Sequence, residues 1–169
     1  MKRLTLVRHA KSDWKDASLK DFDRPLSRRG LREAPGMAEQ LADHKVHVDL
    51  MITSPARRAL ETARFFAKAL DYPLRRLKLE DHLYLARPGE ILDVVRAVGK
   101  RVQHLMLFGH NPGLSDFAHK LTRDKELGEL PTCAVYSMEL DIGSWADARY
   151  GEGRHPTLNH PKNFLDLLT

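Results

Sequence analysis

Four side chains of this sequence have the types that suit phosphate chemistry: Arg8, His9, Arg58 and His110. Arginine donates forked, charge-assisted hydrogen bonds that match the oxygens of a phosphate group. Two guanidinium groups and two imidazoles together therefore suit a dianion. The four residues lie far apart in the sequence, so the fold must bring them together before they can act.

These residues follow short apolar segments that have the length and composition of strands. We predict buried strands at Leu4–Val7, Val48–Thr53 and His104–Phe108, because near-continuous apolar strands are typical of a sheet covered on both faces. Each of the three precedes one of the arginine or histidine segments. Ala134–Leu140 is predicted as a late strand, and Leu74–Leu79 as a less regular strand near an edge of the sheet.

Helical patterns alternate with these strands. Apolar residues recur at helical spacing over residues 56–70, 88–99 and 114–121. A further helix is predicted from Ser27 to about Asp43, in which Pro35 produces a kink or delays the start. The alternation predicts an α/β fold, a three-layer α/β/α arrangement with a mostly parallel central sheet.

Ligands of such a sheet bind where the carboxyl ends of the strands open. After two of the strands, Ser54 and Asn111 are predicted as helix N-caps, with Pro55 and Pro112 at the first helical positions. A helix N-terminus presents free backbone N–H groups and a partial positive charge, which suits a phosphate group. The sequence therefore predicts an oxyanion site at this edge of the sheet.

The two imidazoles could instead bind a metal ion. A cation beside two arginines would be repelled, and no carboxylate lies in these three segments to complete a ligand set. The single cysteine, Cys133, also excludes a multi-cysteine zinc site and an internal disulfide. We therefore expect no metal and no cofactor.

Length and composition limit the classes of protein and partner that remain. The chain has 169 residues and a mass of 19.3 kDa, which suits one domain over residues 1–169, with a loop-rich tail from about residue 147. The net charge is +5. However, the sequence contains no block of like charges, and aromatic residues make up only 7% of it, so we expect no nucleic-acid partner. No apolar run approaches the roughly 20 residues of a membrane span, and no signal-peptide pattern opens the chain, so we expect a cytoplasmic protein without a membrane partner.

Three motifs resemble those of the histidine phosphatase superfamily. Arg8-His9-Ala10 resembles its Arg-His-Gly signature, although Ala10 stands where the wider family has glycine. Residues 54–63 resemble its second arginine motif, in which Arg58 takes the position of the site arginine. Residues 109–113, Gly-His-Asn-Pro-Gly, resemble its second-histidine motif.

Two further segments resemble the same family and extend the likeness over residues 3–145. Residues 23–27 and Gly30 resemble the approach to its first helix, and Pro131-Thr132 with Trp145 resemble the C-terminal end of the short, SixA-type phosphohistidine phosphatases. The resemblance implies a phosphoglycerate mutase-like fold and a phosphohistidine phosphatase acting on a histidine-phosphotransfer protein. A phosphatase of small phosphate esters and a non-catalytic module that binds phosphate or phosphohistidine are the alternatives, and the oligomeric state stays open.

The resemblance also implies roles for individual residues. His9 attacks phosphorus and becomes phosphohistidine, which water then hydrolyses, and nearby arginines lower its pKa so that it stays neutral. Three groups hold the phosphate oxygens: Arg8, Arg58 and His110. Ser12 and Asn111 are expected to contact the substrate.

A proton donor for the leaving group is the least defined part of the expected site. The family often uses a carboxylate after the third strand, which here favours Glu80 before Asp81, with Asp13 as a third candidate. Glu80 and Asp81 could equally be ordinary loop acids. A nitrogen leaving group needs such an acid less than an ester does, so a weak or absent acid favours phosphohistidine as the substrate.

Overall fold

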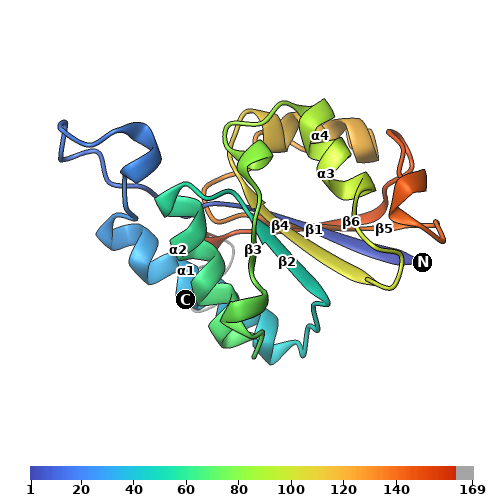
Figure 1. The fold of residues 1–169 in the computed structure, drawn as a ribbon, viewed down its shortest axis with the longest axis horizontal. Helices are drawn as coiled ribbons and strands as arrows, with labels where there is room; N and C mark the ends of the chain where they lie inside the picture. The colour runs from blue at the N-terminus through green and yellow to red at the C-terminus, as the bar shows by residue number, and fades with distance from the viewer. Residues whose placement is uncertain (163–169) are drawn as a thin grey trace.

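Figure 1 shows a six-stranded sheet between two pairs of helices in the computed structural model, which describes residues 1–162. The strands are β1 (Lys2–Arg8), β2 (Leu50–Thr53), β3 (Lys78–Leu79), β4 (His104–Gly109), β5 (Val135–Leu140) and β6 (Arg154–Asn159). The helices are α1 (Arg28–Asp43), α2 (Arg57–Ala69), α3 (Pro88–Arg96) and α4 (Gly113–Thr122). Four short 3-10 helices complete the fold: η1 (Asp21–Asp23), η2 (Leu74–Arg76), η3 (Asp81–Leu83) and η4 (Trp145–Asp147).

The strands lie in the order β3-β2-β4-β1-β5-β6. β1, β2, β3 and β4 run parallel, while β5 pairs antiparallel with β1 and β6 antiparallel with β5. The prediction of an α/β fold with a mostly parallel central sheet is therefore confirmed. Because the four parallel strands point the same way, the residues that follow them gather at one edge of the sheet.

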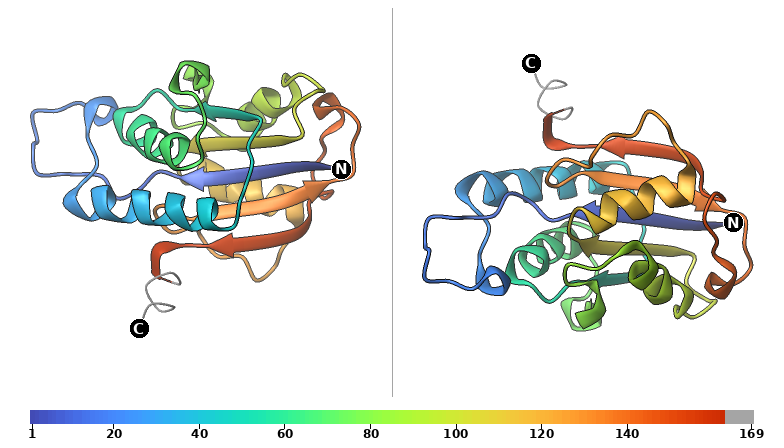
Figure 2. Two further views of the ribbon diagram at one scale, coloured as in Figure 1. Left: turned by 90° about the horizontal axis from the view of Figure 1, so that it is seen from below. Right: turned by 90° about the horizontal axis from the view of Figure 1, so that it is seen from above.

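Each face of the sheet is covered by one pair of helices, as the two views of Figure 2 show. Alternate residues of a strand point to opposite faces, so Leu6 packs in one core cluster and Val7 in the other. Phe117 of α4 belongs to the Leu6 cluster, and Phe66 of α2 belongs to the Val7 cluster. Burial of each such side chain stabilises the fold by about 1.5–3 kcal/mol and fixes the helices against the sheet.

The predicted strand at Leu74–Leu79 is wrong in its first half. Those residues form η2, with backbone hydrogen bonds from Arg76 to Pro73 and from Leu77 to Leu74. Only the two residues of β3 pair with β2, at the edge of the sheet, and both are exposed. An edge strand this short has no buried face to impose a pattern on the sequence.

The predicted loop-rich tail is also wrong in part. β6 lies within it and pairs with β5, with Thr157 opposite Ser137. The sequence did not indicate this strand, because its residues are mostly exposed and it contains Pro156. Proline is tolerated in an edge strand such as β6. Residues 163–169 of the tail lie outside the described residues.

The helix starts differ from the prediction at two of the three junctions. Ser27 does cap α1, because its hydroxyl accepts a hydrogen bond from the Gly30 N–H, and α1 includes Pro35, so a delayed start is wrong. α2 instead begins at Arg57 with Ala56 as its N-cap, and α4 begins at Gly113 with Pro112 as its N-cap. The predicted N-caps Ser54 and Asn111 are therefore wrong, and neither predicted proline occupies a first helical position. No helix within residues 1–162 combines the length and apolarity needed to cross a bilayer.

Candidate active site

A pocket of about 280 Å³ opens at the carboxyl ends of the parallel strands. It receives residues from the end of β1, the segment that follows it, the first turn of α2 and the loop after β4. Its lining residues are Arg8, His9, Lys11, Ser12, Trp14, Asp21, Arg24, Arg58, Leu85, His110, Asn111 and Thr132. The structure therefore brings the two histidines and two arginines of the sequence motifs into one pocket.

His9 follows β1 and is held in one orientation. Its backbone N–H donates to the Gly109 carbonyl at 3.1 Å, and its ring Nδ1 lies 2.7 Å from the Ala10 carbonyl oxygen. A carbonyl only accepts hydrogen bonds, so Nδ1 carries the proton, and the lone pair of Nε2 accepts a hydrogen bond from Nε of Arg58. Burial, with the charges of Arg58 and Arg8 as smaller causes, lowers the pKa of His9 to about 4, so the ring is neutral at pH 7.

His110 lies beside His9, with 5.1 Å between the ring centroids. Its Nε2 is 2.8 Å from the Ser54 hydroxyl, which itself accepts a hydrogen bond from the Ala56 N–H. The Ser54 hydroxyl can donate its own proton to Nε2, and with that donation the proton of the neutral ring lies on Nδ1. Burial and the neighbouring His9 lower the pKa of His110 to about 3.

The two arginines approach the pocket from different elements. Arg8, at the end of β1, donates from Nη1 to the Leu130 carbonyl at 2.7 Å. Arg58, in the first turn of α2, has only 4% of its side chain exposed, and its Nε lies 3.4 Å from Nε2 of His9. Guanidinium groups fixed in this way are ready to bind an oxyanion without further reorganisation.

Three buried nitrogens of pocket residues have no hydrogen-bond partner within residues 1–162: Nε of Arg8, Nε of Arg24 and Nδ1 of His110. Buried donors without partners are costly, because they lose their hydrogen bonds to water. An acceptor-rich anion such as phosphate suits such a set of donors. A metal ion does not, because three arginine side chains line the same pocket.

Comparisons with known proteins agree with this geometry. The model of the histidine phosphatase superfamily (branch 1) matches residues 4–82. An uncharacterized protein of Mycobacterium tuberculosis is 33% identical over 154 residues, which cover 86% of this chain and 93% of that protein. The chain belongs to the histidine phosphatase superfamily.

Solved structures show the same fold. The protein histidine phosphatase SixA in complex with tungstate has a TM-score of 0.81 and 23% identity, covering 95% of this chain and 98% of that one. A SixA-named protein from Agrobacterium tumefaciens has a TM-score of 0.74 and 29% identity, covering 82% of this chain and 92% of that one. The likeness to the superfamily thus extends well beyond the three motifs.

The pocket of this superfamily member also contains an acid that the sequence reasoning missed. Asp21, in η1, receives hydrogen bonds from Arg24 at 2.6 Å, from Nη2 of Arg58 at 3.1 Å and from the Tyr84 hydroxyl. Its backbone carbonyl accepts a further bond from Nη1 of Arg58 at 2.7 Å. Burial raises the pKa of Asp21, but the bonds from Tyr84 and Arg24 and the charge of Arg58 outweigh it and hold the pKa well below its usual range.

A signal for Asp21 and Arg24 was present in the sequence. Residues 23–27 resemble the family segment before the first helix, and Asp21 lies just ahead of them. That segment was interpreted only as the approach to α1, because nothing in its residue types shows that it folds back over the pocket.

The predicted general acid Glu80 lies outside the pocket. Its carboxylate accepts hydrogen bonds from the backbone N–H of His82, at 3.3 Å, and from the ring Nδ1 of His82, at 2.7 Å, and so caps η3. Glu80 lines a different hollow together with Glu90. The other two candidates, Asp81 and Asp13, are also not among the lining residues, and the Asp13 carboxylate accepts a hydrogen bond from the backbone N–H of Lys15.

Ser12 and Asn111 do line the pocket, but both side chains have partners within the protein. The Ser12 hydroxyl accepts a bond from Arg24 at 3.3 Å. The Asn111 amide donates to the Leu130 carbonyl at 3.0 Å and accepts from Ser115, whose backbone N–H is 3.1 Å away. Asn111 therefore fixes the loop after β4, and Ser12 supports Arg24.

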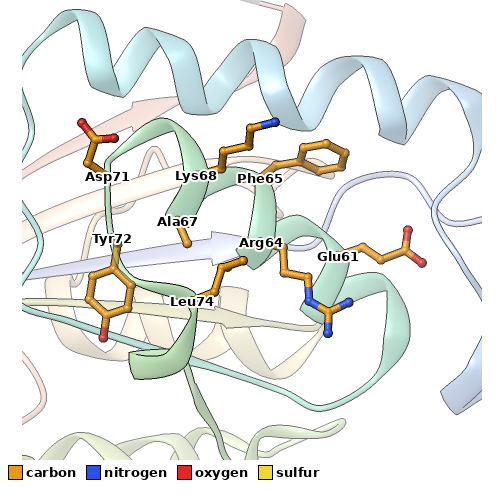
Figure 3. A pocket seen from close by; sticks show the side chains of 8 residues that line it. All are labelled: Glu61, Arg64, Phe65, Ala67, Lys68, Asp71, Tyr72 and Leu74. Carbon is orange, nitrogen blue, oxygen red and sulfur yellow. The ribbon is translucent and has the colours of Figure 1, made fainter.

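A larger groove of about 480 Å³ runs along the outer side of α2, as Figure 3 shows. Its apolar wall comes from Phe65, Tyr72 and Leu74, with Arg64 and Glu61 beside it. It contains no histidine and none of the residues that follow the parallel strands. The histidines and arginines of the motifs therefore lie in the smaller pocket and not in this groove.

Proposed function

We propose that this protein, a phosphatase by its superfamily, removes phosphate from phosphohistidine on a protein, with His9 as the nucleophile. The observation that carries this proposal is the state of Asp21. Within residues 1–162 it is the only carboxylate among the lining residues, and two arginines and a tyrosine hold it ionised. An ionised carboxylate cannot donate a proton to a leaving group.

The lack of a protonated acid among the lining residues within residues 1–162 favours phosphohistidine over phosphate esters as the substrate. A phosphate ester of an alcohol leaves as an alkoxide unless an acid protonates it, so its hydrolysis depends on a proton donor in the pocket. The imidazole of phosphohistidine has a second nitrogen that water can protonate, and it then departs as a neutral ring. The three candidate acids Glu80, Asp81 and Asp13 are not among the lining residues, so a nitrogen leaving group fits this site better than an oxygen one.

The reaction proceeds in two displacements. Nε2 of His9 forms a bond to phosphorus while the bond from phosphorus to the substrate imidazole breaks, and the electron pair leaves with the protonated imidazole. Water then attacks the phosphorus of phospho-His9, the bond to Nε2 breaks, and the proton of water passes to the products. The Nδ1 bond to the Ala10 carbonyl keeps Nε2 directed into the pocket through both steps.

Arg8, Arg58 and His110 stabilise the charge that spreads over the phosphoryl oxygens. Removing one fixed donor of this kind typically lowers the rate by about 10²–10³. The three arginines and Lys11 carry four positive charges and Asp21 carries one negative charge, so with both histidines neutral the lining residues have a net charge of +3, which attracts a phosphoryl dianion. This positive charge supports phosphoryl transfer.

A side-by-side rate comparison tests the proposal. The purified protein is given a histidine-phosphorylated phosphotransfer protein, a phosphoserine peptide and small sugar phosphates. We expect the highest kcat/KM on the phosphohistidine protein, together with an acid-labile radiolabel on the enzyme. Faster turnover of the sugar phosphates would overturn the substrate assignment, and binding without turnover would make the protein a reader of phosphohistidine.

The nucleophile is tested with His9→Ala and the matched variant His44→Ala, since His44 is exposed beyond the end of α1. We expect His9→Ala to abolish both turnover and the radiolabel, and His44→Ala to keep both. More than a few per cent of residual activity in His9→Ala would show that another residue attacks phosphorus.

A further inference from the structure

Large apolar side chains are exposed at the mouth of the phosphate pocket. Trp14 is 68% exposed and Leu85 is 56% exposed, and both line the pocket. Phe22, which is 39% exposed, lies next to Asp21 in η1. We call Trp14, Phe22 and Leu85 the mouth patch. Isolated exposed apolar residues are ordinary, but a group of them around a binding pocket is typical of an interaction surface.

The segment that carries Trp14 and Phe22 is anchored to the pocket. It extends beyond the end of the sheet in both views of Figure 2. The Arg24 guanidinium lies 3.3 Å from the centroid of the Trp14 ring, in a cation–π contact. The rings of Phe22 and Tyr84 lie 5.2 Å apart, which joins this segment to the one that carries Leu85.

Leu85 is held in an unfavourable backbone conformation. Its φ of 49° lies in the left-handed region, which a leucine adopts only at a cost of about 1–3 kcal/mol. The next residue is packed tightly, because a Cβ placed on Gly113 would lie 1.7 Å from the Ala86 carbonyl oxygen. The strain does not bury the Leu85 side chain, so the conformation stabilises no core and instead keeps an apolar group at the mouth.

We propose that the mouth patch docks the protein whose phosphohistidine enters the pocket, by contacting apolar side chains around that histidine. This inference rests on the proposed function. The occupant follows from continuity, because Trp14 and Leu85 border the pocket that receives the phosphoryl group. A free phosphorylated metabolite offers no apolar surface to cover them, whereas the surroundings of a histidine on a folded protein do.

The charges of the segment agree with an apolar contact. Lys11, Asp13, Lys15 and Asp16 alternate in sign, so the segment around Trp14 has no net charge with which to attract a partner. The positive charge of the pocket lies on Lys11 and the three arginines. The arginines therefore recognise the phosphoryl group and the mouth patch recognises the protein that carries it, with tryptophan typical of residues that dominate such contacts.

Two substrates separate the contribution of the mouth patch from that of the arginines. The first is a folded phosphotransfer protein carrying one phosphorylated histidine, and the second is phosphoramidate, which has the same P–N bond without a protein. Rates are measured for the wild type, Trp14→Ala, Leu85→Ala and the control Leu74→Ala. Leu74 is 57% exposed, nearly the same as Leu85, but lies in the groove of Figure 3.

We expect Trp14→Ala and Leu85→Ala each to lower kcat/KM on the protein substrate at least tenfold more than on phosphoramidate, through KM. Leu74→Ala should change the ratio of the two rates by less than twofold. Equal losses on both substrates would overturn the docking role and place the residues in the phosphate site. No loss, or an equal effect of Leu74→Ala, would also overturn it. A wild type inactive on both P–N substrates would instead refute the proposed function.

Discussion

Asp21 binds Arg58 through both its backbone and its side chain: Nη1 of Arg58 donates to the Asp21 carbonyl at 2.7 Å and Nη2 to its carboxylate at 3.1 Å. The acid of the pocket therefore positions an arginine. It also receives a bond from Arg24, so one carboxylate orients two of the guanidinium groups that line the pocket. This arrangement explains why the acid stays ionised inside an anion-binding pocket.

Asp21→Asn should lower kcat/KM on the phosphohistidine protein by about tenfold, and Asp21→Ala by about a hundredfold. Asparagine keeps an acceptor for Arg58, whereas alanine leaves the guanidinium without its side-chain partner. A positioning role predicts that the shape of the pH–rate profile is unchanged in both variants. A loss in Asp21→Asn that appears only with ester substrates, or that removes one limb of the profile, would show instead that Asp21 transfers a proton.

Glu80→Gln should leave activity within twofold of the wild type on phosphohistidine and on esters. The Glu80 carboxylate bonds His82 and lies outside the pocket, so it does not reach a leaving group. The measurement is kcat/KM on both substrate classes at pH 6 and pH 8. A drop of a hundredfold confined to the ester would restore Glu80 as the general acid.

The sequence indicated where the four central residues lie because Arg8, His9 and His110 lie at or directly after the end of a buried strand, and Arg58 lies in the first turn of the helix that follows one. The direction of a parallel strand determines where the next residues lie, so His9 and His110 could be placed without coordinates. Asp21 could not, because it reaches the pocket from an irregular segment whose path depends on tertiary contacts. Glu80 was misassigned for a related reason: position in the sequence placed it near the site, but local capping of η3 turned its carboxylate away.

Ser54→Ala should lower kcat on the phosphohistidine protein by about tenfold, because the Ser54 hydroxyl fixes the tautomer of His110. Without it the proton of His110 is free to move from Nδ1 to Nε2, and a donor to the phosphoryl group is lost for part of the time. The nitrogen NMR shifts of His110 should then show a mixture of tautomers. Ser137→Ala, which removes a hydroxyl bonded to Thr5 outside the pocket, serves as the control and should change neither the rate nor the shifts.

The free energy of unfolding should fall as the pH is lowered below about 6.5. The pKa of His9 is lowered to about 4 in the folded protein, so between these values the unfolded chain binds a proton that the folded one does not. The stability contributed by the neutral ring is therefore fully present above the unfolded pKa and is lost as the pH falls toward 4. One such group adds a slope of about 1.4 kcal/mol per pH unit.

Urea unfolding of the wild type and His9→Asn at pH 5, 6 and 7 measures this slope. His9→Asn should have a smaller slope than the wild type. Carboxylates contribute equally to both proteins, so they cancel in the comparison. Equal slopes in the wild type and His9→Asn would mean that His9 is charged at pH 6 in the folded state.

Gly113→Ala and Gly89→Ala should change stability in opposite directions. A Cβ on Gly113 would overlap the Ala86 carbonyl, so α4 or the neighbouring loop must shift, and such overpacking costs about 1–3 kcal/mol. A Cβ on Gly89, in the first turn of α3, meets nothing within 4 Å, so alanine there should stabilise the protein by up to about 1 kcal/mol.

Because the shift caused by Gly113→Ala also moves Leu85, that variant should lose kcat/KM on the phosphohistidine protein while Gly89→Ala keeps it. Unfolding in urea and the two rates test both effects, and a Gly113→Ala protein of unchanged stability would show that the close contact with Ala86 relaxes freely.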